Sequence, residues 1–395
     1  MKKLFALLLV LAFGLQLAAC GATPAASQGG APASAPASAA GEDGTVQAEG
    51  MLWPVTPLPE KTKLTVSYLA NSTAEVVTYL AQEKGWLDAC NLEVEMVYFA
   101  GGPAQMEAST SWDVGTSGIG GMITGLLNYD IRCLGVVSLD RGLYQAFFAR
   151  KDSPIVQAGT GHSSVEGVWG TADTWKGVKV LTATGTANQY TLYHTLKSFG
   201  LNLSDVEVVN MDIATVPTAF LAGEGDVGGI QGLTIQDPVF QGEDSEYVMV
   251  SSDQLLQCGL PVNYVATAQA METKQQAVEL WLELALMAGE YANANQEEVA
   301  DMMVDMYALD GYETEAEDNL VLIQDNPFIS VAENYAFFTQ TSEDGSMLQA
   351  EAQIYDAMQG YVEMGNYTAD QLDKLISGTS FLPEPVSAAY EHAAQ

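Results

Sequence analysis

Two runs of alternating strand and helix patterns fill the middle of this chain, and they constrain its fold more than any other feature. In the first run, strands of alternating apolar residues are separated by segments of helical spacing, and they are predicted at 64–69, 92–99, 112–118 and 131–137. A second run of the same kind predicts strands at 175–181, 206–211 and 226–230. Repeated strand–helix alternation is typical of parallel sheets with helices on both faces. We therefore expect an α/β protein with two such lobes, each built on a mostly parallel sheet.

Beyond Lys274 the strand pattern stops and helical periodicity continues to the end of the chain. Helices in this part are predicted from residue 278 onwards and near 296–307, 330–340, 347–362 and 369–377. From residue 275 onwards there are 23 Asp and Glu residues and one basic residue, Lys374. Such a charge distribution is typical of a solvated acidic face on helices. We expect these helices to complete the first lobe.

The N-terminus has the order of a secretory signal peptide: Lys2 and Lys3, an apolar stretch at 4–15, and small residues before Cys20. The apolar stretch is shorter than the roughly 20 residues that cross a bilayer. The sequence LAAC at 17–20 resembles the bacterial lipobox, in which the cysteine becomes diacylated and N-terminal. We therefore expect residues 1–19 to be removed and lipidated Cys20 to anchor an extracytoplasmic protein to the cell membrane.

A segment at 21–41 contains no charged residue and consists almost entirely of Ala, Ser, Gly and Pro. This composition cannot bury enough apolar surface to fold, so it predicts a disordered tether. We expect a signal peptide at 1–19 and a lipidated cysteine with its tether at 20–60. The first part of lobe 1 is expected at 61–146, lobe 2 at 147–264, and the helical completion of lobe 1 at 265–395.

The net charge of −36 works against binding to nucleic acid or to anionic lipid. Once Cys20 is assigned to the anchor, Cys90, Cys133 and Cys258 remain, an odd number without the CxxC spacing of a metal site. One disulfide among them stays open, and its pairing does not follow from the sequence. The three histidines form no HExxH pattern. We expect no metal, no cofactor and no catalytic residue.

Ligands of open parallel sheets bind beyond the carboxyl ends of the strands, so the turns at those ends hold the candidate site. These turns are rich in small and hydroxyl residues, which can direct backbone N–H groups and hydroxyls at an oxyanion without a cationic side chain. The alternative is that the same residues are ordinary helix caps and turn formers. The candidate ligand-binding residues are Asn71, Ser72, Thr73, Gly102, Thr116, Ser117, Gly118, Thr184, Gly185, Thr186, Asn188 and Thr215.

Arg141 and Arg150 flank the expected crossover between the lobes. They either reach an anionic ligand or pair with some of the many carboxylates of this chain.

Several short motifs together give the chain a family resemblance. They are YFAGGPAQMEA at 98–108, WDVGTSG at 112–118, WKGVKV at 175–180 followed by Gly185 and Thr186, AFLAGEGDV at 219–227 and QDP at 236–238. With these motifs, residues 64–273 resemble the ABC-importer solute-binding proteins of the nitrate, sulfonate and taurine type. Gln236 stands where such proteins often carry a Trp before Asp-Pro, and it joins the candidate ligand-binding residues.

The resemblance implies a two-lobed type 2 periplasmic-binding fold with crossovers near Phe147 and Val265. It also implies capture of a small anionic or polar organic solute by hinge closure, and delivery of that solute by a monomer to an ABC permease. Two alternatives stay open. One is an enzyme on the same fold, since some relatives make a pyrimidine precursor or remove sulfinate. The other is a surface lipoprotein that binds a macromolecule through the acidic helices after Lys274.

Overall fold

A computed structural model of the 395-residue chain describes residues 44–69, 72–140, 142–376 and 380–394. The expected signal peptide, Cys20 and most of the expected tether lie outside these residues, as do Asn71 and Arg141. Within the described ranges, none of the helices has the length and apolar character needed to span a bilayer.

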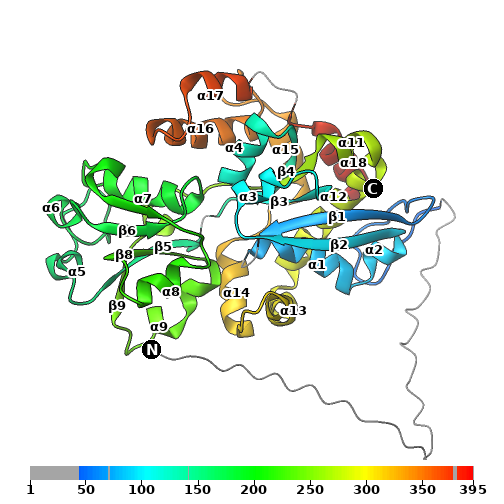
Figure 1. Cartoon of the computed structure of the whole chain (residues 1–395). Helices are drawn as coiled ribbons and strands as arrows, with labels where there is room; N and C mark the ends of the chain where they lie inside the picture. Colours follow the sequence, from blue (N-terminus) through cyan, green and yellow to red (C-terminus); the bar gives the residue numbers. More distant parts are fainter. Residues whose placement is uncertain (1–43, 70–71, 141, 377–379, 395) are drawn as a thin grey trace, which may run out of the picture. The chain divides into compact units, whose positions relative to one another are not determined.

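The first lobe is built on a five-stranded sheet (Figure 1). Its strands are, in spatial order, β2 (Leu92–Phe99), β1 (Thr62–Leu69), β3 (Val114–Gly118), β10 (Val262–Thr267) and β4 (Ile131–Ser138). β1 is parallel to β2 and β3, whereas β10 is antiparallel to both of its neighbours. The sheet is therefore parallel except for the strand that returns from the second lobe.

The second lobe repeats this topology. Its strands are, in spatial order, β7 (Glu207–Asn210), β6 (Lys179–Thr182), β8 (Val227–Gln231), β5 (Gln145–Arg150) and β9 (Tyr247–Ser252). The antiparallel strand is β5, the first strand that the chain forms after it leaves lobe 1. The predicted α/β fold with two mostly parallel sheets is thus confirmed, and the expected lobe boundaries at 146/147 and 264/265 fall inside β5 and β10.

Helices cover both sheets. Before the first crossover they are η1 (Thr73–Glu75, a 3-10 turn), α1 (Val76–Glu83), α2 (Trp86–Ala89), α3 (Gly102–Glu107) and α4 (Ile119–Asn128). The second lobe contains α5 (Pro154–Ala158), α6 (Ala172–Trp175), α7 (Ala187–Lys197), η2 (Leu203–Asp205), α8 (Val216–Leu221), η3 (Gly232–Gln236) and α9 (Pro238–Gln241). The others are α10 (Asp253–Leu256), α11 (Ala268–Thr273), α12 (Gln275–Ala294), α13 (Gln296–Leu309), α14 (Ala316–Asp325), α15 (Val331–Thr339), α16 (Gln349–Glu363), α17 (Ala369–Ile376) and α18 (Pro383–Ala393).

Neighbouring residues of β5 show how one strand supports two apolar layers. Successive side chains of a strand point to opposite faces of its sheet. Phe147 accordingly packs in the cluster that includes Leu192 of α7, while Phe148 packs with Phe220 of α8 on the other face. Helices therefore lie on both faces of the second sheet, as Figure 1 shows.

Two expectations for particular segments differ from the structure. The strand predicted at 175–181 begins only at Lys179, because Trp175 ends α6 and its indole is fully buried. The tether expected to run to residue 60 ends earlier. Trp53 and Val55 are buried in the core of lobe 1, and the Trp53 indole N–H donates to Glu283 Oε1 at 3.0 Å. Residues 46–58 therefore belong to the packed lobe.

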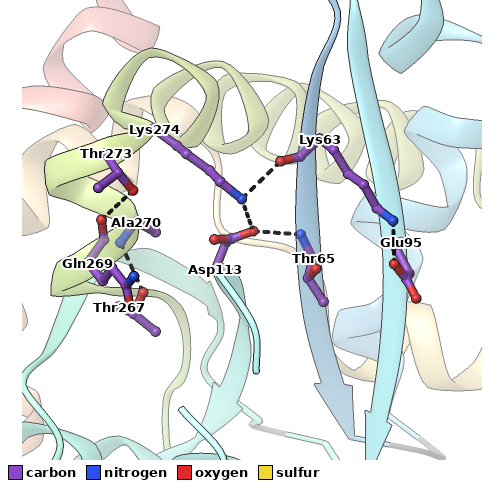
Figure 2. Close-up of polar contacts among 9 residues, drawn as sticks. All are labelled: Lys63, Thr65, Glu95, Asp113, Thr267, Gln269, Ala270, Thr273 and Lys274. Carbon is purple, nitrogen blue, oxygen red and sulfur yellow. Dashed lines mark hydrogen bonds and ion pairs between the residues drawn. The ribbon is translucent and has the colours of Figure 1, made fainter. Parts of the chain in front are cut away.

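The long helix α12 is attached to the first sheet at the edge where the parallel strands begin (Figure 2). Lys274, which precedes α12, places its ammonium 2.7 Å from Asp113 Oδ2 and 3.1 Å from the carbonyl oxygen of Lys63. Asp113 also accepts a hydrogen bond from the backbone N–H of Thr65 at 2.8 Å. One carboxylate thus joins β1, the residue before β3 and the start of the C-terminal helices.

Candidate ligand-binding cleft

A cleft of about 820 Å³ is lined by residues of both lobes at the ends of their strands. This volume lies within the range of pockets that enclose small organic molecules. Lobe 1 and the helical segments that complete it contribute the ends of β1 to β3, the first turns of α3 and α4, and residues 311–315 and 318. Lobe 2 contributes the first turns of α7 and α8 and the segment around η3.

Four predicted residues on the lobe 1 side form the closely packed turns at the ends of the strands: Gly102, Thr116, Ser117 and Gly118. Gly102 lets α3 approach α4, because a Cβ atom there would lie 2.7 Å from the Cα of Gly121. The amide of Gln105 fixes the end of β3 by donating to the Thr116 carbonyl at 3.0 Å.

Ser72 also lines the cleft, and its hydroxyl bonds the Tyr144 side chain. Thr73 does not line it, since its side chain is buried in η1.

On the lobe 2 side, Thr186 and Gln236 are the predicted residues that line the cleft. Thr186 is the N-cap of α7, and its hydroxyl accepts from the Asn188 N–H at 3.2 Å. Asn188 itself is buried in lobe 2, where it accepts from Thr182 and donates to Gln145 at 3.1 Å. Its role in this structure is to hold strands β6 and β5 to α7.

The other predicted residues of lobe 2, Thr184, Gly185 and Thr215, do not line the cleft. Gly185 instead lies at a contact between the lobes. A Cβ atom on Gly120, in the first turn of α4, would be 1.9 Å from the Gly185 carbonyl oxygen. The two lobes can approach this closely only because residue 120 has no side chain.

The two crossovers form the floor of the cleft and are bonded to each other. Asp253, at the start of the second crossover, accepts from the backbone N–H groups of Tyr144 and Gln145 at 3.2 and 2.9 Å. Asp140 lines the cleft, accepts from Ser138 at 2.9 Å and has a φ of 36°, which is unusual for any residue except glycine. Burial raises the pKa of Asp140 to about 7 and that of Asp253 to about 8.

Three tyrosines that sequence reasoning missed also line the cleft. They are Tyr98 at the end of β2, Tyr144 in the first crossover and Tyr312 between α13 and α14. Tyr144 and Tyr98 each lie close enough to Tyr312 to interact with it electrostatically. Residue 312 lies more than two hundred positions from β2 in the sequence, so strand-end reasoning could not have found it.

A cluster of acidic and phenolic groups lies beside these tyrosines in lobe 1. The Tyr68 hydroxyl donates to Asp310 Oδ1 at 2.9 Å. Glu75 is 3% exposed, and its Oε2 has no hydrogen-bond partner among the described residues. Burial, followed by the negative charge of Asp310, raises the pKa of Glu75 to about 9. Glu75 also interacts electrostatically with Tyr144, which connects this cluster with the cleft.

The charged residues of the cleft are all acidic within the part of the chain that the structure describes. No described lysine, arginine or histidine lines it. Five carboxylates do, namely Asp140, Asp237, Glu313, Glu315 and Asp318. Arg150, one of the two arginines considered from the sequence, donates to the backbone carbonyls of Phe220 and Gly225 and lies over the Phe220 ring. Among the described residues it neither lines the cleft nor pairs with a carboxylate.

The three described cysteines are free thiols. Burial raises the pKa of each of Cys90, Cys133 and Cys258 to about 12. A thiol is a nucleophile only as the thiolate, so these positions are held in their unreactive form. Among the described residues, no group of three or more His, Cys, Asp or Glu side chains could hold a metal ion.

Comparison with known proteins connects this geometry to characterised groups. A family model described as NMT1/THI5 like matches residues 73–299, more than half of the chain. The chain is also 23% identical over 243 residues to a protein of Brachyspira hyodysenteriae that carries the provisional name ABC transporter periplasmic binding protein. That match covers 61% of this chain and 68% of the relative.

Solved structures share the fold at low sequence identity. The periplasmic nitrate-binding protein NrtA from Synechocystis PCC 6803 has a TM-score of 0.63 and 11% identity, and the match covers 84% of this chain and 89% of NrtA. The periplasmic aliphatic sulphonate binding protein SsuA from Escherichia coli has a TM-score of 0.58 and 16% identity, with 82% and 94% covered. At these identities the likeness concerns the fold.

Proposed function

This chain belongs to the NMT1/THI5-like family, and from that premise we propose that it is a solute-binding protein that captures a small polar molecule between its two lobes. The observation that carries the proposal is the cleft itself. Both lobes line it, two crossovers join the lobes beneath it, and its volume of about 820 Å³ suits a small organic molecule. The names of the Brachyspira relative and of the nitrate- and sulphonate-binding neighbours support the same function.

Capture works by closure of the lobes around the solute. The crossovers are the segments that change backbone conformation, and Asp253 keeps them together by accepting from Tyr144 and Gln145. A solute that contacts both walls gains interactions only in the closed form, so it shifts the population towards that form. The candidate residues that line the cleft, Ser72, Gly102, Thr116, Ser117, Gly118, Thr186 and Gln236, provide part of these contacts.

The protein delivers its solute to an ABC permease as a monomer tethered outside the cytoplasm. The signal-like order before Cys20 and the uncharged segment after it support a diacylated Cys20 as the anchor. Replacing Cys20 with Ser should move the protein from the membrane fraction to the soluble fraction of cells, and the loss of mass from two acyl chains should be visible by mass spectrometry. An unchanged distribution would contradict the anchor without affecting the capture function.

Native mass spectrometry of the purified protein tests the capture function, because a solute retained during purification adds a discrete mass. Small-angle scattering should then show a smaller radius of gyration with the solute than without it. A protein that carries no added mass, and whose melting temperature is raised by no member of a broad solute library, would contradict the proposal.

Catalysis on the same fold has less support. The described cysteines have pKa values raised to about 12 by burial, and burial lowers the pKa of His194, which works against the thiolate–imidazolium pair of a nucleophilic enzyme. Cys133 is fully buried in the core and contributes nothing to the cleft lining.

A further inference from the structure

We propose that the cleft is selective for an organic cation, a solute with a protonated or quaternary amine, and that it discriminates against small anions. The inference rests on the proposed capture function and narrows it. From the sequence we expect either a small anion or a polar organic molecule. The lining of the cleft favours a polar organic molecule that carries a positive charge.

The charged side chains of the described cleft lining all carry the same sign. Five carboxylates line the cleft and none of the described basic residues does. Asp140 lies at the floor and is 9% exposed, while Glu313, Glu315 and Asp318 come from one stretch of lobe 1. Glu313, Glu315 and Asp318 are exposed, so solvent and salt screen each of them, but all five carboxylates act with the same sign, and a cation is therefore attracted into the cleft and an anion repelled.

Aromatic rings line the cleft together with the carboxylates. Tyr98 at the end of β2, Tyr144 in the first crossover and Tyr312 between α13 and α14 line the same cleft as the carboxylates. Tyrosine rings attract cations through their π faces, and groups of such rings recognise quaternary ammonium ions. Phenolic rings beside carboxylates therefore fit an alkylated or protonated nitrogen better than a strongly hydrated metal ion.

Helix N-termini act in the opposite direction but with less charge. The first turns of α3, α4, α7 and α8 line the cleft, and each N-terminus is equivalent to about half a positive charge. The carbonyl of Gly185 already lies against the first turn of α4. Together these N-termini amount to about two positive charges, which do not offset the carboxylates of the lining, and they suit an uncharged oxygen of the same solute.

Arg141 follows Asp140 and lies outside the described residues, so its influence has to be measured. A single arginine would still leave carboxylates in excess, because Asp237, Glu313, Glu315 and Asp318 line the cleft besides Asp140, whose pKa of about 7 leaves it partly protonated at neutral pH. Its replacement belongs in the experiment, because it is the residue through which an anion would be recognised if the inference were wrong.

The experiment compares solutes of similar size and different charge on the purified full chain. Choline, its neutral carbon isostere 3,3-dimethyl-1-butanol and the anion isethionate form the first set. Putrescine with succinate, and agmatine with 4-guanidinobutyrate, extend it to primary amines and guanidines. Melting temperatures rank the solutes, and isothermal titration calorimetry measures those that stabilise. We expect at least one cation to bind at least about 30-fold more tightly than its neutral or anionic counterpart.

A triple variant tests whether the carboxylates cause the preference. Glu313→Gln, Glu315→Gln and Asp318→Asn together should weaken cation binding about 10-fold at low salt, and less at high salt. The control carries Asp152→Asn, Glu207→Gln and Glu224→Gln, which change the net charge equally at exposed positions outside the cleft. We expect the control to bind as the unchanged protein does.

Three results would overturn the inference. One is tight binding of nitrate or isethionate that is lost in Arg141→Gln, with no cation bound. Another is equal weakening by the control and the cleft variant, because the effect would then reflect net charge alone. If no solute of any charge binds and native mass spectrometry finds no retained molecule, the capture function fails, and the charge assignment fails with it.

Discussion

The two lobes share one topology but contribute unlike walls to the cleft. In each sheet the strand after the crossover is the antiparallel one, and in each lobe the ligand side is formed by the first turns of helices. Lobe 1 and its C-terminal segment contribute hydroxyls and apolar residues and, in addition, Tyr98, Tyr312 and three carboxylates, Glu313, Glu315 and Asp318. Lobe 2 contributes amides, hydroxyls and apolar residues, with Asp237 as its one carboxylate in the described lining.

Carboxyl groups whose pKa is raised by burial are also distributed unequally between the lobes. Among the described carboxyl groups, those with a raised pKa all lie in lobe 1 or in a crossover: Glu75, Asp140, Asp253, Glu283 and Asp310. Under the proposed function, the common fold sets where a solute lies, while side chains at the ends of strands and in the connection between α13 and α14 set which charge is preferred. Lobe 1 would then select the charge, and lobe 2 would close over the solute.

The largest change in solute affinity is expected from a substitution that keeps the two walls of the cleft apart. Gly120→Val adds a side chain where even a Cβ atom would lie 1.9 Å from the Gly185 carbonyl oxygen, so the lobes cannot approach as closely as they do here. We expect solute affinity to fall roughly 100-fold or more while the unliganded melting temperature changes little, because opening the cleft relieves the clash. Calorimetry and small-angle scattering measure both consequences. An affinity within a few-fold of the original would show that this contact is not needed for capture.

The free-energy cost of ionising a buried carboxyl group in lobe 1 can be measured at Glu75. Its pKa in the folded protein is about 9, far above its ordinary value of 4.5, so the folded state keeps a proton that the unfolded state loses. Stability from this group is complete below about pH 4.5 and is lost as the pH rises towards 9, by at most about 1.4 kcal/mol per pH unit. Glu75→Gln removes this loss, and we expect it to be more stable by about 1–3 kcal/mol at pH 8.

Denaturant unfolding at pH 5 and pH 8 measures the difference for Glu75→Gln. The gain should be larger at pH 8, while Asp140 and Asp253 leave a pH dependence common to both proteins. A gain of equal size at both values would mean that Glu75 is not held protonated by its surroundings.

One carboxylate from the floor of the cleft and one from the lobe 2 wall give a direct test of the division of roles. Asp140→Asn keeps the shape of a side chain that tolerates the φ of 36°, and it should weaken cation binding about 10-fold at pH 8. Asp237→Asn keeps an oxygen that can accept from the Val239 N–H, now 2.8 Å away, and should cost less than about 2-fold, because Asp237 is exposed. Equal losses would contradict the division of roles between the two walls.

The pH dependence of cation affinity tests whether Asp140 is the carboxylate that binds the cation. Asp140 has a pKa of about 7 and is surrounded by the Ser138 hydroxyl, Tyr144 and Asp253, whose own pKa is about 8. A bound cation favours the ionised carboxylate, so affinity should rise between pH 6 and pH 8. This rise should be smaller in Asp140→Asn than in the unchanged protein.

The strands that alternation predicted are those that follow or precede a helix in a regular strand–helix unit. The missed strands β5, β9 and β10 lie next to the crossovers, and the helices beside them, α5, α9, α10 and α11, have only four to six residues, too few to show helical periodicity. β5 is also almost entirely buried, so its residues show no polar alternation, and a short apolar run of this kind is ambiguous between strand and helix. The overall class was therefore predictable, whereas the antiparallel strand of each sheet was not.

The same distinction applies to the cleft. Ser72, Ser117 and Thr186 could be proposed from the sequence because the ends of parallel strands determine where a ligand can lie. Tyr312 and Glu313 could not, because they belong to a connection between two helices and reach the cleft only through the packing of α13 and α14 on lobe 1. An acidic run on helices is typical of a solvated face, and nothing local distinguishes the residues that turn towards a ligand.

The smallest effect is expected at the opposite edge of the first sheet, where Lys274 joins α12 to Asp113 (Figure 2). The Lys274 and Asp113 side chains are 35% and 18% exposed, so the pair is only partly screened by solvent. Lys274→Met keeps the length of the apolar stem, and we expect it to cost about 1 kcal/mol in the free energy of unfolding. Asp113→Asn and the double variant complete a cycle that isolates the pair.

Lys274→Met also tests whether the attachment of the C-terminal helices influences solute affinity at the cleft. β3 begins beside Asp113 and ends at the cleft-lining residues Thr116, Ser117 and Gly118, so rigid coupling along the strand would carry a change at one edge to the other. A strand held by hydrogen bonds to β1 and β10 should instead absorb the loss of one ion pair. We therefore expect solute affinity in Lys274→Met to stay within 2-fold of the original, measured by calorimetry under conditions where both proteins are fully folded. A drop of 5-fold or more would mean that the attachment of the C-terminal helices sets the geometry of the charged wall, and that lobe 1 selects its solute through packing as well as through charge.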